Sequence, residues 1–110
     1  MMKQLMTEVN GAIEAELNRA QVNYGRTYHS PHEGYGVLAE ELWEAEEEHD
    51  HVDYIRRLML RALQLEDTEL LLQHMQGIVD RATLAACEYI QVAAVAKKMI
   101  LTLSEVKNNG

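Results

Sequence analysis

Apolar residues recur at intervals of three and four along almost the whole chain, which is the period of an amphipathic α-helix. No stretch shows the sustained apolar and polar alternation of a half-buried strand. The spacing predicts three helices, at about residues 3–23, 31–65 and 68–103. The fold class is therefore all-α, and we expect residues 1–110 to form a single domain.

Two helix starts carry capping signals. Ser30 can cap the second helix, Pro31 suits its first position, and Glu33 completes a capping box three residues after the serine. Asp67 offers a cap for the third helix, and Gly25 lies just past the expected end of the first. These signals fix the boundaries more firmly than periodicity alone.

The third helix contains a segment that is apolar or small on nearly every side, ATLAACEYIQVAAVA at residues 82–96. A helix of this kind is surrounded by other helices, and two helices of one chain would hardly cover it. We therefore expect a helical bundle of about three main helices per chain, completed by oligomerisation with a second chain. In the same segment, Cys87 is expected to be a small buried apolar residue.

The excess of acidic over basic residues limits the kinds of molecule that the chain can bind. The 110 residues include 10 Lys+Arg and 18 Asp+Glu, for a formal net charge of -8. Such a chain repels phosphate backbones, so nucleic acid is not an expected partner. Apolar runs such as Val92 to Ala96 are too short to span a membrane, and the first six residues lack the features of a signal peptide. We expect a cytoplasmic protein without membrane association.

Glu88 is an acidic residue in the apolar segment. An ionised carboxylate buried without compensation is costly, so it would take up a proton, pair with a cation or bind a metal. A protonated or hydrogen-bonded glutamate, or one paired with Arg81 or with an arginine of another helix, is a structural alternative to a functional role.

The second helix contains a dense acidic stretch. No Lys or Arg occurs between Arg26 and Arg56, so the stretch lacks the basic partners that usually stabilise such a helix. A solvated acidic face is the plainer interpretation. The stretch comprises Glu40, Glu41, Glu44, Glu46, Glu47 and Glu48.

Three of these glutamates, Glu41, Glu44 and Glu48, fall at i, i+3 and i+7 and share one side of the helix. If the second and third helices pack antiparallel, Glu41 and Glu44 meet Glu88 in a cluster of oxygen ligands. Mg²⁺ or Mn²⁺ suits such ligands.

The third helix carries two lysines beyond Glu88. Its face continues through Gln91 to Lys98, so Lys98 or its neighbour Lys97 could meet an anionic substrate such as a phosphate chain. Two exposed lysines near a helix C-terminus are the structural alternative.

The spacing Glu-x-x-His occurs at Glu46 with His49 and at Glu48 with His51, as in di-iron helical bundles. Such sites need the pair on two helices, and the third helix contains no second copy. A di-iron protein is therefore the weakest of the alternatives.

Two stretches together resemble the MazG-like all-α nucleoside triphosphate pyrophosphohydrolases. The first is HSPHEGYGVLAEELWEAEEE, residues 29–48, which contains the Glu-Glu-x-x-Glu motif of that family. The second is ACEYIQVAAVAKK, residues 86–98, which is similar to the later motif. The chain departs from the family pattern at Gln91, where Asp is usual, and in a longer gap between Glu44 and Glu88.

The resemblance implies a homo-dimer or tetramer, and a Mg²⁺-dependent enzyme that cleaves a (d)NTP to the (d)NMP and pyrophosphate. It implies catalytic roles for Glu40, Glu41 and Glu44. The implied metal ligands are Glu40, Glu41, Glu44, Glu88 and, through its amide oxygen, Gln91.

The residues that would bind the nucleoside triphosphate substrate are less specific. Lys97 or Lys98 would bind the leaving pyrophosphate. Trp43, Tyr28 or Tyr35 could stack on the nucleobase, with packing in the core as the structural alternative. The alternative to an enzyme is a non-catalytic helical module of the same fold that binds a nucleotide or a protein partner in a regulatory role.

Overall fold

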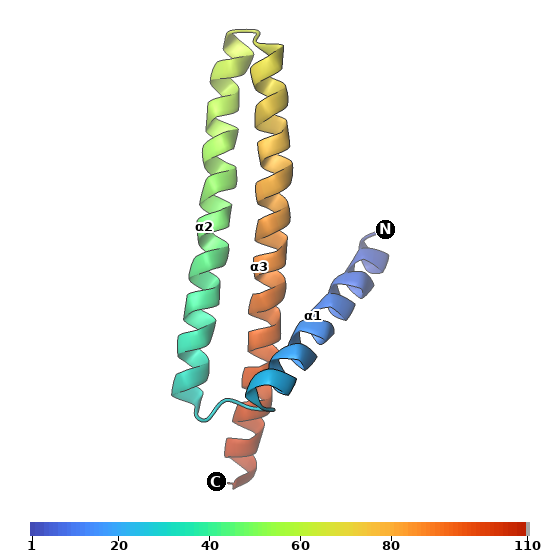
Figure 1. Ribbon diagram of the computed structural model, residues 1–110, viewed down its shortest axis with the longest axis vertical. Helices are drawn as coiled ribbons and strands as arrows, with labels where there is room; N and C mark the ends of the chain where they lie inside the picture. Colours follow the sequence, from blue (N-terminus) through green and yellow to red (C-terminus); the bar gives the residue numbers. More distant parts are fainter. Residues whose placement is uncertain (110) are drawn as a thin grey trace.

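The computed structural model describes residues 1–109, and these form three helices (Figure 1). They are α1 (Met2–Tyr24), α2 (Pro31–Gln64) and α3 (Thr68–Asn109). The all-α prediction is confirmed, since no strand occurs in the described residues. The boundaries agree closely with the sequence, except that α3 extends beyond the expected end near residue 103.

Helices α2 and α3 form a long antiparallel hairpin joined by residues 65–67 (Figure 1). One line of less exposed positions runs along α2 at alternating intervals of four and three from Gly34 to Ala62, and a matching line runs along α3 from His74 to Thr102. This is the heptad spacing of coiled coils, in which two apolar stripes interlock along a seam. The hairpin is thus a two-stranded antiparallel coiled coil.

Two glycines allow close approach along the seam. A Cβ atom on Gly34 would overlap the Met99 side chain and lie 3.0 Å from the Tyr28 ring. A Cβ atom on Gly77 would lie 3.2 Å from Cδ1 of Ile55. Because neither glycine has a side chain, larger neighbours fill the space between the helices.

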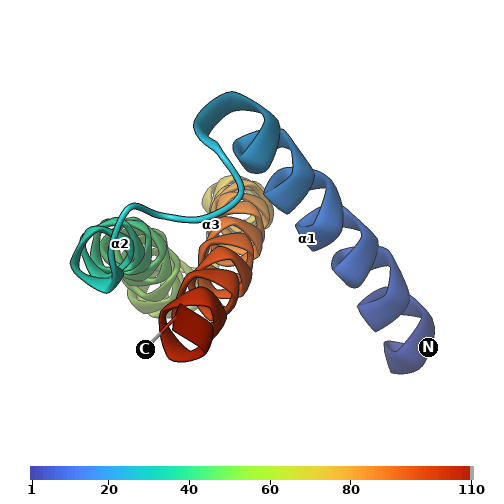
Figure 2. The ribbon, with the colours of Figure 1, turned by 90° about the horizontal axis from the view of Figure 1, so that it is seen from below.

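Helix α1 packs on α3 away from α2 (Figure 2). Its buried residues Ile13 and Leu17 form a small core with Ala94, against which Ile90 and Ala93 pack. Residues 1–12 are exposed, and this half of α1 diverges from the hairpin (Figure 1). Helix α1 therefore contributes only its C-terminal half to the core.

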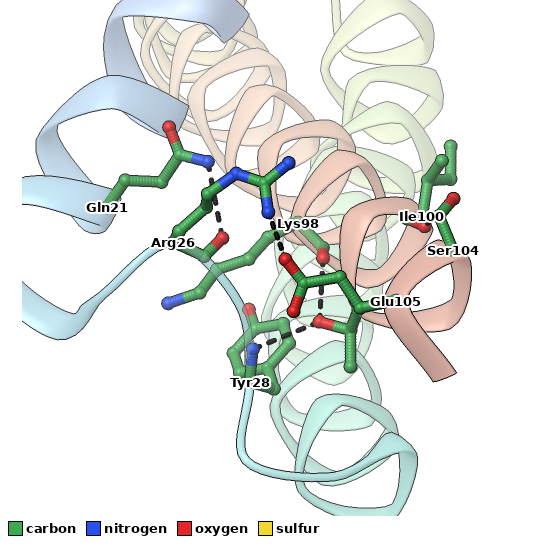
Figure 3. Close-up of polar contacts among 8 residues, drawn as sticks. Gln21, Arg26, Tyr28, Lys98, Ile100, Ser104 and Glu105 are labelled. Atoms are coloured by element: carbon green, nitrogen blue, oxygen red, sulfur yellow. Dashed lines mark hydrogen bonds and ion pairs between the residues drawn. The ribbon is translucent and has the colours of Figure 1, made fainter. Parts of the chain in front are cut away.

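The connection between α1 and α2 is anchored to the end of α3 (Figure 3). Gly25 ends α1 with a φ of 96°, a conformation that glycine adopts readily. The Tyr28 backbone N–H donates to Oγ1 of Thr102 at 3.0 Å, and this hydroxyl donates to the Lys98 carbonyl at 2.9 Å. Arg26 forms an ion pair with Glu105. These contacts fix where α2 begins relative to α3.

Both predicted helix caps are present. The Ser30 hydroxyl accepts a hydrogen bond from the Glu33 N–H at 3.1 Å, and the Asp67 carboxylate accepts from the Leu70 N–H at 3.1 Å. The Glu33 carboxylate accepts from the N–H of His29, at 3.5 Å, so the return bond of the expected capping box is displaced by one residue.

The whole molecule measures 64 × 29 × 22 Å, an extended shape for its length. Long flanks of the helices remain open, which is consistent with a bundle completed by other chains. The expectation that Cys87 is buried is wrong: its side chain is exposed because neither α1 nor α2 covers that side of α3. No helix within residues 1–109 is both long and apolar enough to cross a membrane.

Candidate metal centre

The middle of the hairpin seam is polar. Glu41 and Glu48 of α2, and Arg81 and Glu88 of α3, occupy heptad positions that usually hold apolar side chains. Charged groups at such positions lose hydration and need partners there. The middle of the seam therefore contains polar groups at positions where apolar residues would stabilise the hairpin at less cost.

Three of the predicted carboxylates come together at this point. Glu41 and Glu44 project from α2 and Glu88 from α3, and one oxygen of each lies within 4.8 Å of the others. All three residues are half-buried. The antiparallel packing of the two helices brings them together, as the sequence predicts.

Burial and mutual repulsion disfavour the charged forms of this cluster. The pKa of Glu41 is raised by burial and then by the charges of Glu44, Glu88 and Glu40. The pKa of Glu88 is raised by burial, by the charge of Glu44, by a hydrogen bond with the Glu44 carboxyl group and by Glu48. The cluster would gain from a proton or a cation.

No basic side chain within residues 1–109 forms an ion pair with the cluster. Arg81 pairs with Glu48, with 3.4 Å between Nη1 and Oε2, and so does not supply the partner considered for Glu88. None of the ion pairs formed by residues 1–109 includes Glu41, Glu44 or Glu88.

The donor set fits a hard divalent cation. Mg²⁺ binds oxygen ligands at about 2.1 Å, which places ligand oxygens about 3 to 4 Å from one another. One oxygen of each carboxylate lies within 4.8 Å of the others, slightly wider than that range, so a bound ion would draw the three groups together. Glu41, Glu44 and Glu88 are therefore the residues that could hold the ion.

The structure directs two other predicted residues toward α1. The Gln91 amide nitrogen donates to the Glu16 carboxylate at 2.6 Å, and Glu16 also pairs with Arg19. Lys97 forms an ion pair with Glu14. Both residues are thus engaged with α1.

Lys98 is buried although Lys97 is exposed. Only 3% of Lys98 is accessible, and its ammonium lies 4.5 Å from the centre of the Tyr28 ring (Figure 3). This is a cation–π contact. The pKa of Tyr28 is raised by burial and by the charges of Glu41 and Glu33, which places the ring in the field of the acidic residues of α2. The alternative of two exposed helix-end lysines therefore fails for Lys98.

Glu40 and Trp43 lie on the exposed part of α2. Glu40 is outside the group of three carboxylates, although its charge contributes to the raised pKa of Glu41. The Trp43 side chain is 62% exposed and does not belong to the core.

The predicted histidines do not join the cluster. His49 and His51 are exposed, and His51 borders a shallow hollow with Glu47, Asp50 and Tyr54. Within the described part of the chain, Glu41, Glu44 and Glu88 form the one group of three or more His, Cys, Asp or Glu side chains close enough to share an ion. The structure gives the di-iron interpretation no support.

Sequence reasoning named Tyr28 as a residue that could stack on a base, but it missed the contact of Tyr28 with Lys98 and the two glutamates of α1. Glu14 and Glu16 lie next to the apolar residues Ile13 and Leu17, but their partners depend on which flank of α3 receives α1. Tyr28 lies in a connection without periodicity, and no pattern indicated its contact with Lys98.

A surface hollow of about 690 Å³ lies between residues 24–29 and the C-terminal end of α3, and none of the three carboxylates lines it. Comparisons of the chain with models of protein families, with curated proteins and with solved structures give no significant match.

Proposed function

We propose that this protein is a Mg²⁺-dependent nucleotide pyrophosphohydrolase of the MazG-like type, which cleaves a (d)NTP to the (d)NMP and pyrophosphate. The observation that supports it is the convergence of Glu41, Glu44 and Glu88 from two helices without a neutralising cation. The carboxylates of a solvated acidic face would point into water, whereas these three are half-buried and lie together between α2 and α3.

In this proposal Glu41, Glu44 and Glu88 bind the ion, with Mn²⁺ as a possible substitute for Mg²⁺. A divalent ion supplies the positive charge that neutralises a triphosphate and activates water for attack on phosphorus. Glu40 lies beside the cluster with its carboxylate free in the described structure, and so is the candidate to accept a proton from the attacking water.

Two lysines are candidates to bind the phosphate chain. Lys98 lies ten residues beyond Glu88, about 15 Å along the helix, and helical side chains tilt toward the N-terminus and therefore back toward the carboxylates. Its buried ammonium would have to leave the Tyr28 ring to reach a phosphate. Lys97 would exchange its ion pair with Glu14 for a phosphate oxygen. The exposed ring of Trp43 could stack on the base.

The same proposal includes a cytoplasmic protein that assembles as a homo-dimer or tetramer. Its support is the open apolar flanks of the bundle and the single cysteine, which cannot form a disulfide within the chain.

The second candidate is a non-catalytic nucleotide- or protein-binding regulatory module. One observation favours it: Gln91 stands where the resembling family has Asp, and its amide donates to Glu16. An amide adds no negative charge, and this amide is already engaged with α1.

The experiment is pyrophosphate release from a panel of ribo- and deoxyribonucleoside triphosphates, measured with Mg²⁺, with Mn²⁺ and with EDTA. We expect metal-dependent release that Glu44→Ala abolishes, with unchanged helical circular dichroism. Glu47→Ala is the matched control, because Glu47 is an exposed glutamate one turn along α2. Unchanged turnover in Glu44→Ala would sink the assignment, and nucleotide binding without release would favour the regulatory module.

A further inference from the structure

Helix α3 carries a second apolar stripe on a flank outside the seam with α2. Its positions alternate at intervals of three and four, the spacing that allows two helices to interlock. Several members are largely exposed, including Leu72 at 63% and Ile100 at 61%. The α3 stripe consists of Leu72, Met75, Val79, Ala82, Ala86, Tyr89, Ala93, Ala96, Ile100 and Leu103.

Little of residues 1–109 covers the α3 stripe. Helix α2 occupies the seam, and α1 reaches the stripe only near its middle, where Ala93 packs against the small core. The N-terminal half of α1 diverges from the hairpin and does not reach the end at which α3 begins (Figure 1). Between the two helices lies an apolar hollow of about 260 Å³, bordered by Val9 and Tyr89.

We propose that the α3 stripe is the docking surface for a second copy of this chain, with the two α3 helices antiparallel about a two-fold axis. The order of the three- and four-residue intervals reads the same from either end of the stripe. A two-fold pairing centred between residues 87 and 88 therefore sets every stripe position opposite another stripe position.

The sizes of the side chains match in this register. Large residues meet at the ends, where Leu72 faces Leu103 of the second copy. Small residues meet near the centre, where Ala82 faces Ala93, and Ala86 leaves room for the Tyr89 ring. Small central residues with large terminal ones suit helices that cross at a shallow angle and approach most closely at the middle.

The extent of the surface also fits a second copy. The stripe is about 45 Å long, so a helix as long as α3 is needed to cover it. Pairing would bury its six large side chains, its alanines and part of α1, on the order of 800 Å² per chain, the usual size of a stable interface. No stripe residue is charged, so two chains of net charge -8 meet on an uncharged surface.

The α3 stripe would be an interface of the homo-dimer or tetramer included in the proposed function, and to that extent it rests on that proposal. Its tests measure mass and cross-linking without nucleotide, so their failure is distinguishable from failure of the metal assignment.

The first test compares Met75→Glu with Leu84→Glu by sedimentation equilibrium. Met75 belongs to the stripe and is 45% exposed, whereas Leu84 lies outside it on the same helix and is 46% exposed. The 12.6 kDa chain should sediment as a dimer or a multiple of it. Met75→Glu should raise the dissociation constant at least about tenfold, and Leu84→Glu should not. A monomeric wild-type chain, or equal effects of the two substitutions, would overturn the proposal.

The second test fixes the register. In a Cys87→Ser background, Ala82→Cys and Ala93→Cys together should give a disulfide-linked dimer on mild oxidation. The two positions are about 16 Å apart along one α3, too far to join within a chain. Ala82→Cys alone should not cross-link, because the antiparallel register separates the two copies of that position. An oligomer in which only the single variant cross-links would contradict the register.

Discussion

At the scale of single residues, Glu88 has the most consequential position. It occupies a heptad site that an apolar residue would fill with less cost, and it faces Glu44 across the seam. Burial and the Glu44 charge both raise its pKa. The residue is thus unfavourable for the fold alone, and it is one of the three carboxylates that could hold a cation.

We predict opposite effects of Glu88→Gln on stability and on metal affinity. The amide keeps a hydrogen bond with Glu44 and removes a like charge, so the free energy of unfolding at pH 7 should rise. Affinity for Mn²⁺, measured by titration calorimetry, should fall at least about tenfold, since a ligand is lost. Glu47→Gln on the exposed face serves as the control. Unchanged Mn²⁺ affinity in Glu88→Gln would contradict the metal site.

The raised pKa values predict how stability depends on pH. The folded chain holds protons on Glu41 and Glu88 more tightly than the unfolded chain does. Between the ordinary value of 4.5 and the raised values, the free energy of unfolding should therefore fall as pH increases. Urea unfolding from pH 4.5 to 8 measures this slope, which should be smaller in the double variant Glu41→Gln with Glu88→Gln. Parallel curves for the two proteins would show that the cluster does not titrate as described.

Helical periodicity explains which part of the site could be predicted. The spacing of Glu41 and Glu44 places both on one side of α2, and antiparallel packing is enough to bring Glu88 to them. The contacts of Gln91 and Lys97 could not be predicted in the same way. They depend on which flank of α3 receives α1, and the weak amphipathic pattern of α1 does not specify that flank.

At the scale of the elements, three helices and two caps were predictable because caps and periodicity are local signals. The additional length of α3 has a local reason too. Residues 104–109 contain neither proline nor glycine, so nothing stops the helix where its apolar pattern fades. The angle between α1 and the hairpin was not predictable. Helix α1 contacts only α3, and these contacts join residues that are far apart in the sequence.

Replacing each of two glycines of α2 by alanine should change the stability of the protein in opposite directions. Gly36 has open space around its Cα, so Gly36→Ala should stabilise the protein by about 0.5–1 kcal/mol through helix propensity. Gly34 lies against Met99 and Tyr28, so Gly34→Ala should lose this gain and destabilise by about 1–3 kcal/mol. Chemical denaturation of both variants measures the difference. Equal gains would show that the hairpin does not approach closely at Gly34.

At the scale of the whole molecule, few side chains are buried. The buried apolar residues within positions 1–109 are Ile13, Leu17, Ala45, Ala62 and Ala94, most of them small. A chain with so small a core depends on association for part of its stability.

The melting temperature should therefore depend on protein concentration. A tenfold increase in concentration should raise it by a few degrees in the wild-type chain, because association favours the folded state. Met75→Glu should lower the melting temperature and make it independent of concentration over the same range. Differential scanning calorimetry at several concentrations measures both effects. A wild-type melting temperature that stays constant would argue against stabilising association.

The short turn at residues 65–67 predicts the order in which the hairpin assembles. Contacts beside the turn join residues close in sequence and cost little loop entropy, so the coiled coil should zip from this end. Arg81 would then meet Glu48 before Glu88 meets Glu44, and the carboxylates would come together after the rate-limiting step. Glu88→Gln should accordingly slow unfolding while leaving the folding rate nearly unchanged, and stopped-flow kinetics would record the difference.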